Sequence, residues 1–359
     1  MTADVPHHLF QTPARARIVA DDVAAILQAD LPWRELDGAV VLVSGASGFL
    51  AAYMVETLLA MREHLGIGPR RIVALVRSLA NGRARFGHHG ERDDLQFVEA
   101  NVEDVFTIDG EVDYIVHAAS PASPRFYLTN PVGVLSANLA GTANLLALAR
   151  EKGSRFLFFS SGEVYGEAPI VPTGEGDYGF LEPVAVRSCY AESKRAGETM
   201  CVCWTHQYGL HTSIVRPFHT YGPGVALDDG RVFADFVADV VDGRDIVMKS
   251  DGSAKRAFCY IADATEGFFT VLLKGESATP YNIGNEQAEI SIKELAETLV
   301  ALFPEKGLKV VTDPSRQSGD YAASPIRRNA PSTARARRLG WVPRTSIEDG
   351  FRRMVLSYA

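Results

Sequence analysis

Hydrophobic residues follow two alternating patterns along this chain from residue 39 onward. Short continuous apolar runs, typical of strands buried on both faces of a parallel sheet, alternate with longer segments that have helical spacing. The predicted strands cover residues 39–45, 71–76, 95–102, 113–120, 155–161 and 211–218, and the predicted helices cover residues 49–63, 132–152 and 190–208. Strands that alternate with helices pair in parallel through right-handed crossovers, so the pattern predicts an α/β fold with a doubly wound parallel sheet.

The regular alternation ends near Pro217, and the segments beyond it are shorter and richer in Gly and Pro. We therefore expect three parts. The first is an N-terminal helical extension over residues 1–37, with one helix at residues 21–30. The second is a sheet domain over residues 38–216. The third is mainly a smaller C-terminal substrate-binding lobe over residues 217–359, although part of residues 255–290 returns to the sheet domain.

Composition and charge narrow the class of protein. Of the 359 residues 47% are hydrophobic and 22% are charged, which is typical of a globular protein. The net charge of -8 without a basic stripe argues against a nucleic-acid partner. No apolar run approaches the roughly 20 residues that span a bilayer, and residues 1–17 lack a signal-peptide core. We therefore expect no membrane partner and a cytoplasmic location.

The four cysteines do not have the paired spacing of a zinc framework. We expect reduced thiols and no metal site from them; they are Cys189, Cys201, Cys203 and Cys259.

A glycine-rich turn joins the first predicted strand to the first helix. It reads Gly45-x-x-Gly48-x-x-Ala51, and glycines there let backbone N–H groups approach a dinucleotide diphosphate at the helix N-terminus. The position between strand and helix favours a Rossmann-type dinucleotide site. The second strand ends in Arg77 instead of the acid that binds ribose hydroxyls, and a guanidinium suits a 2′-phosphate or an adenine face. The expected cofactor is therefore a nicotinamide dinucleotide, with NADP open beside NAD.

Two later segments carry side chains suited to hydride-transfer chemistry. Tyr190 and Lys194 lie four residues apart on one helix face, where the ammonium is expected to lower the tyrosine pKa. The phenolate could then take a proton from a hydroxyl as hydride leaves the same carbon. Ser161 and Glu163 follow the preceding strand, where they could bind the reacting oxygen and move a proton. A Tyr-x-x-x-Lys spacing alone also occurs on ordinary amphipathic helices.

In this order and spacing the motifs resemble the extended short-chain dehydrogenase/reductases. Within them the chain is most similar to the NAD-dependent nucleotide-sugar epimerase/dehydratase group, and there to the UDP-glucuronate decarboxylases. The resemblance runs from about residue 39 to 341. It is carried by residues 117–146, 160–166, 187–201, 228–236 and 251–263.

The resemblance implies roles for residues of this chain. Ser161, Glu163, Tyr190 and Lys194 would be catalytic. The cofactor would contact Gly45, Ser47, Gly48, Phe49, Leu50, Arg77, Asn101, Val102, Ala118, Ala119, Ser120, Asn138, Tyr190, Lys194, Pro217 and His219. The nucleotide sugar would contact Ser123, Arg187, His219, Arg231, Val232, Arg256 and Arg328.

Four positions depart from the family pattern. Arg77 replaces the ribose-binding acid, His219 stands where an asparagine contacts the nucleotide sugar, and Ala330-Pro331 replaces Pro-Asp. Gly162 precedes the glutamate, where dehydratases carry aspartate and decarboxylases carry serine. The glycine argues against 4,6-dehydration.

The resemblance implies an enzyme that works through a 4-keto sugar, with a tightly held cofactor that is recycled in each turnover. Decarboxylation of a UDP-hexuronate is the expected reaction. A 4-epimerase, a 4,6-dehydratase and a non-catalytic NAD(P)-binding regulator remain alternatives. The family also implies a homodimer built on the helices near residues 132–152 and 190–208.

Overall fold

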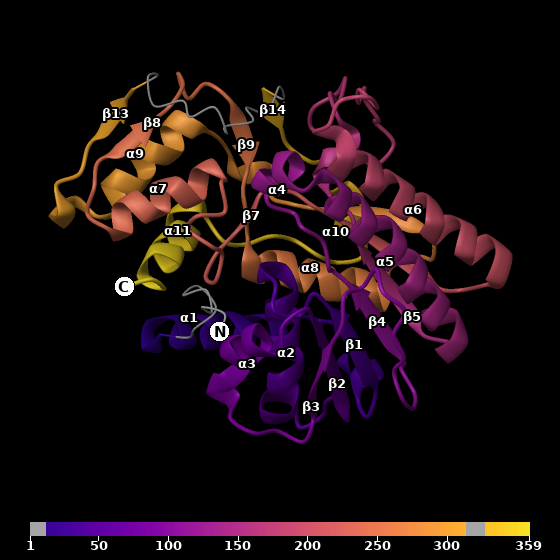
Figure 1. The fold of residues 1–359 in the computed structure, drawn as a ribbon. Coiled ribbons are helices and arrows are strands. Elements are labelled where there is room, and N and C mark those ends of the chain that lie inside the picture. The colour runs from indigo at the N-terminus through magenta and orange to yellow at the C-terminus, as the bar shows by residue number, and fades with distance from the viewer. Residues whose placement is uncertain (1–11, 314–326) are drawn as a thin grey trace.

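The computed structural model describes residues 12–313 and 327–359 (Figure 1). A seven-stranded parallel sheet has the order β11-β6-β5-β4-β1-β2-β3, which confirms the predicted doubly wound fold. Its strands are β1 (Val40–Ser44), β2 (Arg71–Val76), β3 (Leu95–Glu99), β4 (Tyr114–His117), β5 (Arg155–Phe159), β6 (Thr212–Pro217) and β11 (Thr279–Ile283). The order reverses between β1 and β4, and ligands of such sheets bind at the carboxyl ends of the strands on either side of that point.

Alternate side chains of β1 pack on opposite faces of the sheet. Val41 and Val43 face a core shared with α1 (Pro13–Leu27), α2 (Phe49–Leu65) and α8 (Ile261–Lys274). Val40 and Leu42 face a second core, shared with α5 (Pro131–Lys152) and α6 (Ser188–Tyr208). The continuous apolar run at 39–45 follows from this two-sided burial.

The helix α5 corrects one expectation from the sequence. By length and composition it could cross a membrane, although only half of its most apolar stretch is buried. In this fold it packs beside α6 and against β4 and β5, as a helix of the doubly wound sheet.

The N-terminal helix begins earlier than predicted. Thr12 accepts a hydrogen bond from the Arg15 amide and Pro13 occupies the first turn, so α1 starts there instead of at residue 21. The helix packs against α2 and α8. The segment considered for a signal peptide falls mostly on residues 1–11, outside the described residues.

A smaller lobe lies apart from the sheet, at the upper left of Figure 1. It contains α7 (Val232–Val241), α9 (Ile292–Leu302) and α11 (Ile347–Leu356), with β8 (Ile246–Met248) paired to β13 (Val310–Thr312). The remaining helices and strands are short: α3 (Leu79–Phe86), α4 (Pro124–Thr129), β7 (Thr220–Tyr221), β9 (Lys255–Ala257), β10 (Cys259–Tyr260), β12 (Glu289–Ser291), β14 (Arg328–Asn329) and α10 (Ala334–Arg338). Five 3-10 turns complete the described elements: η2 (Trp33–Leu36), η3 (Gly87–His89), η4 (Gly162–Tyr165), η5 (Glu286–Ala288) and η6 (Pro304–Lys306). Both α8 and β11 return from the lobe side to the large sheet.

Candidate active site

A cavity of about 1120 Å³ opens at the carboxyl ends of the central strands. Most of the residues predicted for the site line it: Gly45, Ser47, Gly48, Phe49, Leu50, Arg77, Val102, Ala118, Ala119, Ser120, Ser123, Ser161, Glu163, Arg187, Tyr190, Lys194, Pro217, His219, Arg231, Val232 and Arg256.

Three predicted residues do not line this cavity. Asn101 is exposed and bonds Asp104, because β3 ends two residues before it. Asn138 is fully buried in α5 and donates to the Ser193 hydroxyl at 2.9 Å, so it can reach the site only through α6. Arg328 is exposed and pairs with Glu289 across the short strands β14 and β12.

The turn after β1 has the form that a diphosphate needs. Gly45 has φ +67°, and a Cβ there would lie 2.7 Å from the Ala119 Cα. Gly48 is the N-cap of α2 and has no side chain to cap it, so the N–H groups of the first turn face the cavity uncovered. The backbones of β1 and β4 thus approach closely beside a helix N-terminus, an arrangement that fits a dinucleotide.

Buried polar contacts fix the strand ends around this turn. The Ser44 hydroxyl lies 2.8 Å from His117 Nδ1 and accepts a hydrogen bond from the Ala119 amide. His117 Nε2 lies 3.0 Å from the Thr142 hydroxyl. Burial, with the charge of Lys194, lowers the His117 pKa to about 3, so this histidine is a neutral structural group.

Tyr190 and Lys194 extend from α6 toward Ser161 at the end of β5. The Ser161 side chain is a hydrogen-bond partner of the Tyr190 phenol. The Lys194 ammonium donates to the Phe159 carbonyl at 2.8 Å and lies 5.8 Å from the centre of the Tyr190 ring.

The pKa values of Tyr190 and Lys194 differ from those expected from the sequence. Burial and the Glu163 carboxylate raise the Tyr190 pKa to about 12, and burial lowers the Lys194 pKa to about 7. The expectation that Lys194 lowers the tyrosine pKa is therefore wrong for the protein without ligands. The physical reason is that desolvation disfavours both charged forms, and the ammonium is held by a backbone carbonyl instead of the phenol.

Glu163 begins the turn after Ser161 and is held by an arginine. Its amide donates to the Ser161 hydroxyl at 3.1 Å, and its carboxylate pairs with Arg187 at 3.2 Å. At Gly162, between them, a Cβ would lie 3.1 Å from the Phe218 ring. A larger side chain at this position would have to displace that ring.

An aromatic ring that the motifs did not identify covers Tyr190. Tyr127, from α4, stacks on it with ring centres 4.9 Å apart and planes 16° apart. Helix α4 is short and lies between β4 and α5, so only the place of Tyr127 inside the resemblance segment 117–146 could have singled it out. Other cavity-lining side chains that were missed are Ser78, Asn81, Asp229, Asp235, Lys249 and Phe258.

The far end of the cavity is lined by arginines and aspartates. Arg231 is paired with Asp229, whose carbonyl accepts a hydrogen bond from Ser123 at 2.5 Å. Arg256 lies near His219, and the charges of Arg256 and Arg231, after the larger effect of burial, lower the His219 pKa to about 3. The Nε2 atom of His219 is buried without a hydrogen-bond partner among the described residues. A neutral imidazole lining this cavity suits a polar group of a ligand.

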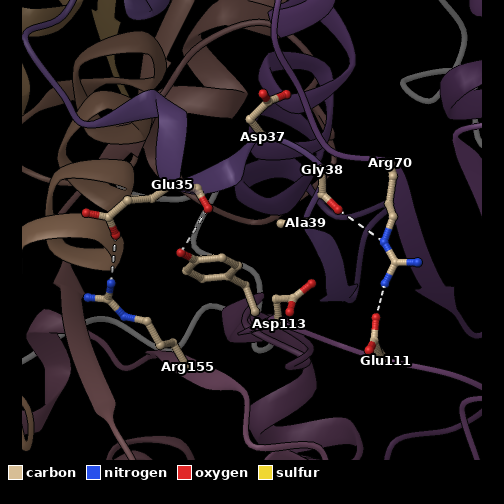
Figure 2. A pocket seen from close by; sticks show the side chains of 9 residues that line it. Glu35, Asp37, Gly38, Ala39, Arg70, Glu111, Asp113 and Arg155 are labelled. Carbon is tan, nitrogen blue, oxygen red and sulfur yellow. Dashed lines mark hydrogen bonds and ion pairs between the residues drawn. The ribbon is translucent and has the colours of Figure 1, made fainter.

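A second, smaller pocket of about 390 Å³ lies at the opposite edge of the sheet, at the amino ends of the strands (Figure 2). Its charged groups satisfy one another, because Arg70 pairs with Glu111 and Arg155 pairs with Glu35 at 3.0 Å. Ser161, Tyr190 and Lys194 line the larger cavity, so we take that cavity as the candidate active site.

A doubly wound sheet, a glycine turn at a helix N-terminus and a Ser/Tyr/Lys set in one cavity define a dinucleotide-dependent enzyme. A family model described as the NAD dependent epimerase/dehydratase family matches residues 41–284. The chain belongs to this NAD-dependent family.

The chain is also similar to named enzymes that act on nucleotide sugars. UDP-glucuronic acid decarboxylase 6 of Arabidopsis thaliana is 35% identical over 315 residues, covering 86% of each chain. UDP-glucuronic acid decarboxylase 1 of Xenopus tropicalis is 32% identical, covering 89% of this chain and 72% of the relative. Among solved structures, DesIV, a dTDP-glucose 4,6-dehydratase from Streptomyces venezuelae with NAD bound, has a TM-score of 0.75 and 26% identity, covering 89% of this chain and 96% of that one.

Proposed function

We propose that this enzyme removes carbon dioxide from a UDP-hexuronate of the UDP-glucuronate type and releases a UDP-pentose. One observation carries the proposal: Ser161, Glu163 and Tyr190 lie together in a cavity that is also lined by Arg187, Arg231 and Arg256. Guanidinium groups bind phosphate and carboxylate oxygens in forked geometry, so the same cavity suits a diphosphate and a sugar acid. The relatives at 32–35% identity that are named UDP-glucuronic acid decarboxylases support the same reaction.

The first step takes a proton and a hydride from the same sugar carbon. Tyr190, ionised to the phenolate, accepts the proton of the C4 hydroxyl, and the Ser161 hydroxyl holds that oxygen in place. NAD, when bound, supplies the acceptor for the hydride from C4 and later returns it. Lys194 would be freed from the Phe159 carbonyl to bind the cofactor ribose and to stabilise the phenolate.

The ketone then makes the loss of carbon dioxide easy. A C4 ketone turns the C5 carboxylate into a β-keto acid, so the electrons of the breaking bond move to the ketone oxygen as an enolate. Ser161 and the protonated Tyr190 stabilise that oxygen. The new C5–H bond takes a proton from a water molecule that the Glu163 carboxylate positions, so each turnover consumes one proton from solvent. Arg187 keeps the Glu163 carboxylate in place beforehand.

The test is direct. Purified protein with NAD is incubated with UDP-glucuronate, and released carbon dioxide and the nucleotide products are measured. The proposal predicts one carbon dioxide for each UDP-pentose. A stable 4-epimer of the substrate would replace the decarboxylase assignment with an epimerase. A stable 4-keto sugar that keeps its carboxylate, formed with one reduced NAD, would replace it with a dehydrogenase.

We infer further that two copies associate through α5 and α6. The two helices pack side by side, and their outward faces carry small or apolar exposed residues: Ala140 and Ala147 on α5, and Val202 and Cys203 on α6. The half-buried state of the apolar helix α5 also favours a covered face.

Ala140→Arg should convert a dimer to a monomer in light-scattering measurements, because a guanidinium would be buried at the contact without a partner. Ala80→Arg, at an exposed position of α3, is the control and should remain a dimer. A wild-type monomer at micromolar concentration would contradict the inference.

A further inference from the structure

Glu56, His88 and His89 form a compact cluster on the sheet domain, outside the cavity that holds Tyr190. Glu56 extends from α2, and both histidines belong to the 3-10 turn η3 that follows α3. His89 Nε2 lies 2.6 Å from one carboxylate oxygen and His88 Nε2 lies 3.4 Å from the other. One ligand atom from each of the three residues lies within 4.8 Å of the other two.

The carboxylate at the centre of this cluster is buried and incompletely bonded. Glu56 is only 6% exposed, and its Oε1 atom has no well-formed hydrogen bond among the described residues. A buried charge is costly unless it is paired or coordinates a metal.

The surroundings contain two further charges. Arg85 and Arg92 both lie close enough to Glu56 for its charge to affect their pKa. Arg92 is itself paired with Asp94 at 2.7 Å, and neither arginine contributes a metal ligand. The site therefore has one anionic oxygen and two imidazole nitrogens as ligand atoms.

We propose that Glu56, His88 and His89 bind a divalent transition-metal ion, for which Zn²⁺ is the best fit. Imidazole and carboxylate are common zinc ligands, and three protein ligands leave a fourth tetrahedral position for water. Tetrahedral ligands at about 2.1 Å from the ion lie about 3.4 Å apart. The 2.6 Å contact between Glu56 and His89 would have to widen, which rotation of the histidine side chain allows.

The place of the cluster indicates a structural role. The ion would tie the middle of α2 to the turn η3, and α2 is the helix whose N-terminus carries the glycine turn. His88 is exposed, which gives an ion a path from solvent. The cluster lies outside the cavity, so the metal would take no part in the chemistry at Tyr190.

The experiment compares four proteins: wild type, His88→Ala, His89→Gln and His64→Ala. Glutamine at position 89 can still donate a hydrogen bond to Glu56 but is a poor zinc ligand, so it separates metal binding from hydrogen bonding. His64 is exposed on the same helix as Glu56 and is the matched control. Each metal-free protein is titrated with Zn²⁺ against a coloured chelator, and its melting temperature is measured with and without the ion.

We expect one Zn²⁺ equivalent in wild type and His64→Ala, and affinity at that site at least about tenfold weaker in the other two. The ion should raise the melting temperature of wild type and His64→Ala by a few degrees and leave the other two unchanged. Exposed residues elsewhere, such as Cys203 and His206, would bind the ion equally in all four proteins. Equal affinity in all four, retention of full affinity by His89→Gln, or absence of binding by wild type would overturn the proposal.

Discussion

Tyr190 and Lys194 show at the scale of single residues what spacing predicts and what it leaves open. The sequence places them four apart on one helix face, and the structure confirms that they lie in the same cavity. Their acid strengths depend on burial and on the partner that each group finds, and burial raises one pKa to about 12 and lowers the other to about 7. Spacing contains no information on either effect.

Arg77 is the residue that we predict to decide the choice between NAD and NADP. It follows β2, is exposed, and lines the cavity beside Ser78 and Asn81. A guanidinium can bind a 2′-phosphate with two hydrogen bonds, each worth about 1.5–3 kcal/mol when charged. If the protein accepts NADP, Arg77→Ala should therefore weaken NADP binding by at least about tenfold and NAD binding far less, as measured by fluorescence titration.

Arg83→Ala, an exposed arginine of α3, is the control for this measurement and should leave both affinities unchanged. Equal losses of NAD and NADP affinity in Arg77→Ala would instead indicate stacking of the guanidinium on adenine, which both cofactors share.

At the scale of elements, the β1–α2 turn depends on one glycine. Gly45 has a left-handed backbone, and a Cβ there would meet the backbone of Ala119, which cannot move aside without shifting β4. Gly45→Ala should therefore reduce NAD affinity by more than about tenfold and lower the free energy of unfolding by more than about 1 kcal/mol. Calorimetric titration and urea unfolding measure the two effects.

Gly209 supplies a matched control for that substitution. It has φ +68°, almost the same as Gly45, but a Cβ added there would meet no described atom within 4 Å. Gly209→Ala should cost only the left-handed strain of about 1 kcal/mol and should leave NAD affinity unchanged. Equal NAD affinity in both variants would contradict the close approach at Gly45.

The site was predictable to the extent that it is built from strand ends and helix starts. Ser161 and the Gly45 turn follow from the rule that parallel strands present ligands at their carboxyl ends. Tyr127 was missed because it comes from the short helix α4, whose place depends on tertiary packing instead of periodicity. Arg328 was expected at the nucleotide, but in the structure it pairs with Glu289. It lies on β14, which pairs with β9 in a small sheet, and the local sequence does not predict that pairing.

At the scale of the whole molecule, one buried carboxylate joins the N-terminal helix to both parts of the protein. Asp22 of α1 accepts hydrogen bonds from the hydroxyls of Tyr53 on α2 and Tyr260 on β10. It also pairs with Arg353 of α11, at 2.8 Å. Helix α1 is therefore tied to both the sheet domain and the smaller lobe.

Burial raises the Asp22 pKa to about 6 from its ordinary 3.8, against the opposing effect of its hydrogen bonds and Arg353. The folded state therefore keeps a proton that the unfolded state loses as the pH rises from about 4 to 6. Stability from this group falls by about 2–3 kcal/mol across that window and is constant above it. Urea unfolding of wild type against Asp22→Asn, at several pH values, should show this difference in slope.

Asp21→Asn is the control for the pH series, because Asp21 is the exposed neighbour on the same helix. It should follow the wild-type dependence. A constant difference between Asp22→Asn and wild type from about pH 4 to 7 would mean that Asp22 titrates normally in the folded protein.

The central claim is that Tyr190 removes a hydroxyl proton while hydride leaves the same carbon for NAD and later returns. Rapid mixing of the NAD-loaded enzyme with UDP-glucuronate, followed by the absorbance of reduced nicotinamide, tests this most directly. In wild type the signal should rise and then fall as carbon dioxide is released. In Tyr190→Phe it should not appear, although NAD stays bound and turnover drops by about 10²–10⁴. Carbon dioxide released without any reduced nicotinamide, or an unchanged signal in Tyr190→Phe, would contradict the account.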